Sequence, residues 1–123
     1  MAFPMIQFKA TNVDLDMSLQ DLMEQKLHSL QKFISDGQDL KCEVEFEKVT
    51  TQQSGFIHRI EVNFYQDGTL FRAEATEDSF EKAADEVRNE LDKEMRRAGK
   101  KRDTLYKRGG RAVKNLLQMG ERW

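Results

Sequence analysis

The stretch FIHRIEVNFYQDGTLFRAEAT, residues 56–76, decides the fold because it reads as two strands joined by a tight turn. Apolar and polar residues alternate on both sides of Asp67-Gly68, as they do in strands with one buried and one solvated face. The Asp-Gly pair is a strong hairpin signal, since a type I′ turn needs positive φ at both of its central residues. The side chains predicted to point inward are Phe56, His58, Ile60, Val62, Phe64, Phe71, Ala73 and Ala75.

Two further strands are predicted upstream of this hairpin. In LKCEVEFEK, residues 40–48, apolar residues and cysteine alternate with Lys or Glu, which is typical of a strand with one wet face. MIQFKA, residues 5–10, alternates in the same way. Four strands with one apolar face are enough to form a stable sheet.

A helix is predicted between the first and second of these strands. Apolar residues recur at three- and four-residue steps from Leu19 to Ile34. Ser18 is a suitable N-cap, and Gly37 is a suitable end. The helix is therefore expected to be amphipathic, with one side in the core.

A second helix is predicted after the hairpin. Asp78 and Glu81 have the spacing of a capping box. The helix is expected to run through about Ala98 and to end at Gly99.

The order of these elements predicts an α+β fold, βαβββα, with two helices packed on one face of a four-stranded sheet. Residues 1–98 are expected to form one domain, since a chain of 123 residues suits a single small core. Residues 99–123 are expected to form a basic flexible tail.

Composition points to a soluble protein of the cytoplasm. No apolar run approaches the ~20 residues that a membrane-spanning helix needs, and MAFPMIQF lacks the features of a signal peptide. Cys42 is the only cysteine and forms no internal disulfide, which fits a reducing compartment. We therefore expect a cytoplasmic protein with no membrane partner.

The sequence carries no recognisable catalytic or metal-binding motif. It has no Cys-x-x-Cys, His-x-x-x-His, Gly-x-Ser-x-Gly or Walker pattern. The two histidines, His28 and His58, lie beside or within predicted apolar faces and are interpreted as structural or surface residues. We therefore expect no enzyme activity, no cofactor and no metal.

Charge is divided unevenly along the chain. Residues 1–92 hold nine Lys or Arg and 19 Asp or Glu, whereas residues 93–123 hold 11 and three. This asymmetry fits contact with a polyanion such as nucleic acid, and it also fits a solvated tail that aids solubility. Charge alone does not decide between the two.

The position of the cations on the second predicted helix favours the polyanion. Apolar residues cluster on one side of a helical wheel of residues 80–100, and a polar row lies opposite. The helix macrodipole favours cations only within the last turn, by ~0.3–1 kcal/mol each. The row opposite the apolar side consists of Lys82, Asn89, Lys93, Arg96, Arg97 and Lys100. Beyond the expected end of the helix, the positive run continues in Lys101, Arg102, Lys107, Arg108 and Arg111.

The outer face of the predicted sheet is a poor surface for RNA. It carries mostly Glu and Arg, and Tyr65 is the only aromatic residue on that face of the middle strands. RNA recognition motifs, in contrast, stack bases on aromatic side chains of an open sheet. The helical side and the tail are therefore the predicted docking surface, which would recognise the shape of an RNA backbone.

Three stretches carry a family resemblance: QKLHSLQKF at residues 25–33, the Asp-Gly hairpin, and EDSFEKAADEVRNELDKEMRRAGKKR at residues 77–102. In these stretches the chain resembles the short ribosome hibernation-promoting factors, a family that includes the ribosome-associated inhibitor and was once called the sigma-54 modulation proteins. The resemblance implies a βαβββα fold similar to a double-stranded RNA-binding domain. By position it implies RNA contacts at Lys26, Lys32, Lys93, Arg96, Arg97, Lys100 and Lys101.

The resemblance also implies a function. Members bind the small ribosomal subunit and its rRNA at the mRNA and tRNA decoding channel and block translation in stress or stationary phase. The tail is too short for the C-terminal domain with which long members pair ribosomes, so we expect the short class, which does not pair ribosomes by itself. We also expect a monomer off the ribosome and no DNA partner. Two alternatives stay open: a general RNA-binding module of double-stranded RNA-binding type, and an adaptor whose basic tail binds an acidic protein.

Overall fold

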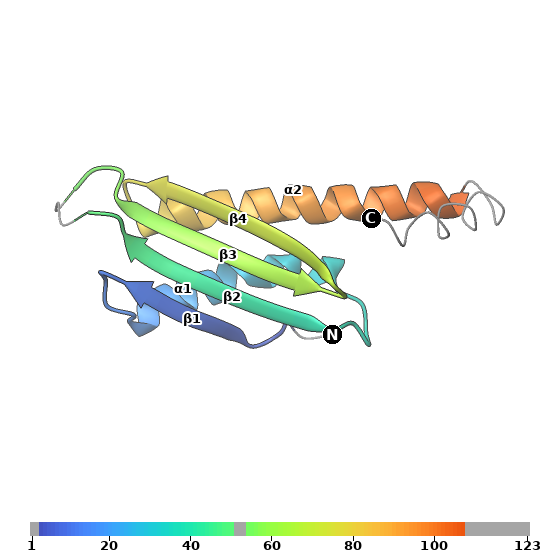
Figure 1. Ribbon diagram of the computed structural model, residues 1–123, viewed down its shortest axis with the longest axis horizontal. Helices are drawn as coiled ribbons and strands as arrows, with labels where there is room; N and C mark the ends of the chain where they lie inside the picture. The colour runs from blue at the N-terminus through green and yellow to red at the C-terminus, as the bar shows by residue number, and fades with distance from the viewer. Residues whose placement is uncertain (1–2, 51–53, 108–123) are drawn as a thin grey trace.

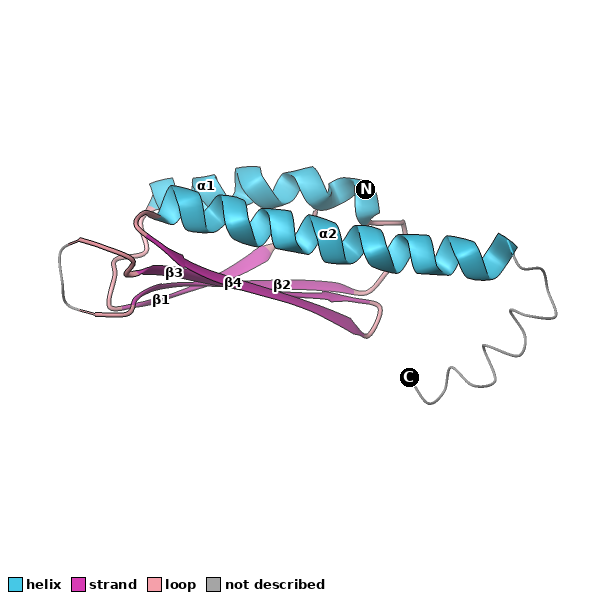
Figure 2. Cartoon of the chain, turned by 90° about the horizontal axis from the view of Figure 1, so that it is seen from above, coloured by secondary structure: helices cyan, strands magenta, loops and turns pink. Residues whose placement is uncertain are grey.

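The chain folds into a four-stranded sheet that is covered on one face by helices (Figure 1 and Figure 2). The computed structural model describes residues 3–50 and 54–107, and of residues 101–107 it describes the backbone alone. The predicted α+β class and the order βαβββα are confirmed. In chain order the elements are β1 (Ile6–Thr11), α1 (Met17–His28), the short 3₁₀ helix η1 (Ser29–Phe33), β2 (Leu40–Lys48), β3 (His58–Gln66), β4 (Thr69–Glu77) and α2 (Phe80–Lys107).

The strands lie in the order β1-β2-β3-β4 across the sheet. β1 pairs with β2 in parallel, because α1 and η1 return the chain along one face, and the other two pairs are antiparallel. At the hairpin turn φ is 49° at Asp67 and 83° at Gly68, so both central residues have the positive φ of a type I′ turn. The hairpin prediction is confirmed.

The core lies between the sheet and the helices. Alternate residues are buried in β2 from Cys42 to Phe46 and in β3 from Ile60 to Phe64, as the sequence predicts. Phe46 meets Phe80 of α2 edge to face, with ring centroids 5.6 Å apart. Burial of each such large apolar side chain stabilises the fold by ~1.5–3 kcal/mol. The helices contribute Met23, Leu27, Leu30, Phe80, Ala83, Ala84, Val87, Leu91 and Met95 to this core.

The prediction that Phe56 points inward is wrong. Phe56 lies before β3 with 68% of its surface exposed, whereas its neighbour Ile57 is buried. The Ile57 N–H donates to the Gly55 carbonyl at 2.9 Å, and the Val49 N–H donates to the Ile57 carbonyl at 3.0 Å. The chain therefore bends at Gly55–Ile57, so the alternation of the strand does not extend back to Phe56.

α1 begins and ends differently from its prediction. Asp16, not Ser18, is the N-cap: its carboxylate accepts the Leu19 N–H at 2.9 Å, and Ser18 lies inside the helix. The α-helix stops at His28, where the Ser29 hydroxyl donates to the Lys26 carbonyl at 2.8 Å, and the chain continues as η1. The predicted helix through residue 36 is therefore two shorter elements.

α2 is longer than predicted. Ser79 caps it by accepting the Lys82 N–H at 3.2 Å, so the predicted capping box of Asp78 and Glu81 is wrong. The helix runs through Gly99 and ends at Lys107, because one glycine costs a helix only ~1 kcal/mol and good helix formers flank it. Residues 99–107 are thus helical and not part of a flexible tail. The rest of the predicted tail, residues 108–123, lies outside the described residues.

Candidate nucleic-acid interface

Ion pairs connect α1 and η1 to α2 on the side of the helical layer where these elements lie against each other (Figure 2). Lys26 Nζ of α1 lies 2.6 Å from Asp85 Oδ1, and Lys32 Nζ of η1 lies 3.5 Å from Asp92 Oδ2. Two of the predicted RNA-binding lysines are therefore paired with carboxylates of the other helix.

Asp92 contacts a second cation with its other oxygen. Arg96 directs its Nε and Nη2 at Asp92 Oδ1, at 3.3 and 3.2 Å. Lys32 Nζ and the Arg96 guanidinium each lie 5.3 Å from the centre of the Phe33 ring, within the range of a cation–π contact. One carboxylate thus holds two cations over one aromatic ring.

Arg88 belongs to the same surface and was missed by the sequence analysis. It lies three residues after Asp85 and four before Asp92, so the three side chains share one side of α2. Its Nε is buried and has no hydrogen-bond partner among residues 3–50 and 54–100. The spacing from the two aspartates could have identified it. We call Lys26, Lys32, Asp85, Arg88, Asp92 and Arg96 the interhelical cluster.

The other predicted cations of α2 with described side chains are all exposed, as expected. Lys82 Nζ lies 3.1 Å from Asp78, and Arg97 Nη1 lies 3.1 Å from Glu94. In each pair the carboxylate is four or three positions earlier in the sequence. Lys93 lines a shallow hollow with Asn89 and Arg72 between α2 and β4, and makes no ion pair with the side chains that the structure describes. Lys100 follows Arg96 by one helical turn.

Charge changes sign along α2. Residues 80–92 hold two Lys or Arg and five acids, whereas residues 93–107 hold seven and two. Lys101, Arg102 and Lys107 lie in the last two turns, where the macrodipole favours cations, but Lys93 lies more than three turns from the end and outside its reach. The macrodipole therefore does not account for the whole row. Arg108 and Arg111 lie outside the described residues.

The opposite face of the sheet carries a network centred on Arg59. Its guanidinium lies 2.6 Å from Glu74, 3.0 Å from Glu47 and 3.1 Å from Glu61. The hydrogen bond to Glu74 raises the pKa of Arg59, and the same bond lowers the pKa of Glu74. Arg59 and these carboxylates satisfy one another, so among the described residues the centre of this face offers no free cation, and Tyr65 alone is not an aromatic platform for bases.

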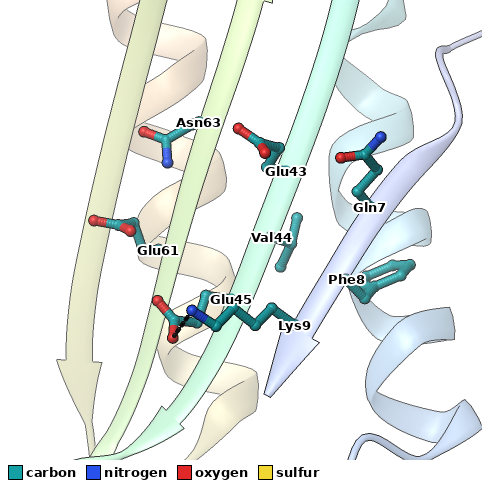
Figure 3. Close-up of a pocket in the computed structure, with 8 residues that line it drawn as sticks. All are labelled: Gln7, Phe8, Lys9, Glu43, Val44, Glu45, Glu61 and Asn63. Atoms are coloured by element: carbon teal, nitrogen blue, oxygen red, sulfur yellow. Dashed lines mark ion pairs between the residues drawn. The ribbon is translucent and has the colours of Figure 1, made fainter. Parts of the chain in front are cut away.

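A hollow on this face is lined by residues of β1, β2 and β3. Figure 3 shows its lining, in which Lys9 reaches toward Glu45 with a separation of 4.0 Å. Within the described residues, no three His, Cys, Asp or Glu side chains are grouped to hold a metal. Burial, with a smaller effect of Glu43, raises the pKa of Cys42 to about 12, so the thiol stays protonated. His58 is a structural residue: its ring packs edge to face on Phe80 at 4.9 Å.

A family profile described as Sigma 54 modulation protein / S30EA ribosomal protein matches residues 6–103. The chain belongs to this family. The match spans all of β1 to β4 and almost all of α2, so it includes the interhelical cluster and the cations up to Arg102. The family assignment drawn from the sequence is therefore confirmed.

Two solved structures share the fold of this S30EA-family protein. The N-terminal domain of Protein Y from Thermus thermophilus has a TM-score of 0.63 and 20% identity, covering 74% of this chain and 93% of that one. A ribosomal subunit interface protein from Coxiella burnetii has a TM-score of 0.60 and 22% identity, covering 76% and 96%. At these identities the likeness shows the fold. No curated protein matches the chain significantly.

Within residues 3–50 and 54–107 of this S30EA-family protein, no helix is both long enough and apolar enough to span a membrane.

Proposed function

We propose that this protein binds the small ribosomal subunit through its rRNA, at the mRNA and tRNA decoding channel, and blocks translation in stress or stationary phase. Family membership supports association with the ribosome. One protein of the same fold is named a ribosomal subunit interface protein. The observation that carries the proposal is the set of exposed cations Lys93, Arg96, Arg97 and Lys100 on α2, with Lys32 of η1 sharing Asp92 with Arg96 and Lys26 of α1 paired with Asp85 earlier on the same helix.

The ion pairs of this row leave its cations available to RNA. In the pair of Arg97 with Glu94, the side chains are 64% and 35% exposed. Exposed pairs of this kind contribute only ~0–1 kcal/mol to stability. Replacement of the carboxylate by a phosphate therefore costs little free energy, and phosphate is at least as strong a partner for arginine.

Binding through the helical side requires no chemical step. A domain held by several phosphate contacts in the decoding channel would exclude mRNA and tRNA by its volume alone. The sheet face, with its carboxylates matched to Arg59, would then point away from RNA. This orientation follows from charge, since phosphates are repelled by Glu-rich surfaces.

Salt dependence tests whether phosphates are the ligand. If six to ten cations contact phosphates, affinity for isolated small subunits should fall ~10³- to 10⁵-fold between about 50 and about 200 mM salt. Cosedimentation of the full chain with small subunits over this range measures the slope. An affinity that does not change with salt would contradict the proposal.

Competition with a random RNA duplex tests the choice of target. The proposal expects the small subunit to displace the duplex at physiological salt, because only the subunit presents phosphates in the shape that the domain fits. Equal retention on both ligands would instead assign the chain as a general RNA-binding module of double-stranded RNA-binding type.

A further inference from the structure

Asp85 and Asp92 differ from the other carboxylates that pair with cations of α2. Glu94 and Asp78 pair with residues three or four positions away, as exposed helical residues commonly do. Asp85 instead reaches across to Lys26 of α1, and Asp92, besides its pair with Arg96 four positions on, reaches across to Lys32 of η1, so each contacts a lysine about 60 positions earlier in the chain. They neutralise cations from both helices at the surface where RNA is proposed to bind.

Asp92 has the contacts that a phosphate would have. One of its oxygens faces Lys32 and the other faces Arg96, just as the two non-bridging oxygens of a phosphate can accept from two cations. Its side chain is 22% exposed, whereas Lys32 and Arg96 are 56% and 50% exposed. The carboxylate thus lies below its two cations, which remain open to solvent.

Arg88 provides a second observation at the same place. Its Nε–H is buried between the positions of the two aspartates and has no acceptor among the described residues. A buried donor without a partner raises the free energy of the state that contains it, by ~1–3 kcal/mol. A ligand that brings an acceptor, or that draws an aspartate toward Arg88, removes this cost.

We propose that Asp85 and Asp92 are specificity-determining residues of the RNA interface, which occupy the phosphate positions of the interhelical cluster until folded RNA displaces them. This inference rests on the proposed function. A polyanion that does not present phosphates at both positions must compete with the two carboxylates already in place, so its binding free energy improves little from contact with the cluster. RNA that presents phosphates at both positions, seven residues or about 10 Å apart along α2, replaces both at once.

The two aspartates therefore lower affinity for all RNA but lower it most for RNA of the wrong shape. Discrimination of this kind comes from a repulsive element placed against the competitor. It also reduces salt dependence, because cations already neutralised by a carboxylate release fewer counterions when RNA binds.

The test uses a double variant that carries both Asp85→Asn and Asp92→Asn, and compares it with the unaltered protein. A matched control combines Asp14→Asn with Glu43→Gln, which changes the net charge equally but lies in the β1–α1 connection and on the sheet. Affinities for isolated small subunits and for a random RNA duplex are measured over a range of salt, together with thermal melting.

The inference expects the double aspartate variant to bind the random duplex about tenfold more tightly at low salt, with a salt slope steeper by about one for each freed cation. Its affinity for the small subunit should change by less than about threefold. The control should shift both affinities by the same small factor. Preference for the subunit would then be reduced only in the aspartate variant.

Two results would overturn the inference. One is an equal gain in affinity for the subunit and the duplex that matches the gain of the control, which would show that the aspartates act only through the net charge of the protein. The other is a lower melting temperature with an unchanged preference for the subunit over the duplex, which would show that the aspartates only stabilise the packing of α2 against α1 and η1. If the unaltered protein fails to prefer the subunit, the proposed function itself is contradicted.

A single variant guards against loss of folding. Asp85 is 48% exposed and holds only Lys26, so Asp85→Asn should leave the Asp92 contacts and the fold intact. About half of the logarithmic gain in duplex affinity is expected for this variant. No gain relative to Asp14→Asn would also overturn the inference.

Discussion

At the scale of single residues, Asp16 determines where α1 begins. It accepts hydrogen bonds from the Leu19 N–H and the Ser18 hydroxyl, and these bonds, that of Leu19 foremost, lower the pKa of its carboxyl. A carboxyl whose folded-state pKa is lowered stabilises the fold above its unfolded-state pKa, and this contribution is lost as pH falls through the folded-state value.

Asp16→Ala should therefore lower the melting temperature at neutral pH, and the deficit should shrink as pH falls below about 4. Asp16→Asn keeps an acceptor for the Leu19 N–H and should lose less at neutral pH. Ser18→Ala is the matched control, since Ser18 only donates to Asp16. A larger loss in Ser18→Ala than in Asp16→Ala would restore Ser18 as the cap.

Sequence analysis placed the cations correctly on the exposed side of α2 but not their partners. The wheel of α2 identifies which side chains face the solvent, because one helix has one period. The pairs of Lys26 with Asp85 and of Lys32 with Asp92 depend on how two helices lie on a sheet. That arrangement is a property of the packed core, so no local pattern reports it.

At the scale of elements, α2 is the feature that departs most from its prediction. Gly99 is predicted to end the helix, but its φ is not in the left-handed region, and a Cβ at this position would meet no described side chain or more distant backbone atom within 4 Å. Lys and Arg on both sides of it are good helix formers, so the helix continues to Lys107. The basic residues up to Lys107 therefore extend a rigid element.

Gly99→Ala should stabilise the protein by ~0.5–1 kcal/mol, because alanine is the better helix former and meets no neighbour there. Chemical denaturation measures the change. Gly68→Ala serves as the contrast: its φ of 83° is unfavourable for alanine, so this variant should be destabilised. A destabilising Gly99→Ala would show that Gly99 ends the helix.

The strands were predicted more accurately than the helix ends. The alternation of apolar and polar residues in β2 and β3 identifies both the extent of each strand and the side chains that face the core. With a period of two, a shift by one residue would expose every buried side chain, so only one assignment is acceptable. Caps depend on single hydrogen bonds, and Asp16, Ser18, Asp78 and Ser79 are all acceptable residues for that role. Local chemistry therefore gave several candidates, and only the structure chooses among them.

At the scale of the whole molecule, the two faces have opposite electrostatic properties. On the sheet, Arg59 pairs with Glu47, Glu61 and Glu74, and Arg72 pairs with the last two as well. On the helical side, the cations in the second half of α2 outnumber the acids, and Arg96, Arg97 and Lys100 are exposed to solvent. Their clustering along one helix was predictable from the sequence, but the Arg59 network was not, because it joins three strands.

The central claim is that the cations of α2, and not the protein's charge in general, bind the small ribosomal subunit. Its most direct test is cosedimentation with small subunits of a chain carrying Arg97→Glu and Lys100→Glu. The control carries Lys9→Glu and Lys41→Glu, which change the net charge equally on the sheet side, where both lysines are exposed. We predict that the α2 variant loses binding at least about a hundredfold, with its melting temperature unchanged, while the control loses less than about fivefold. Equal losses in the two variants, or binding retained by the α2 variant, would contradict the account.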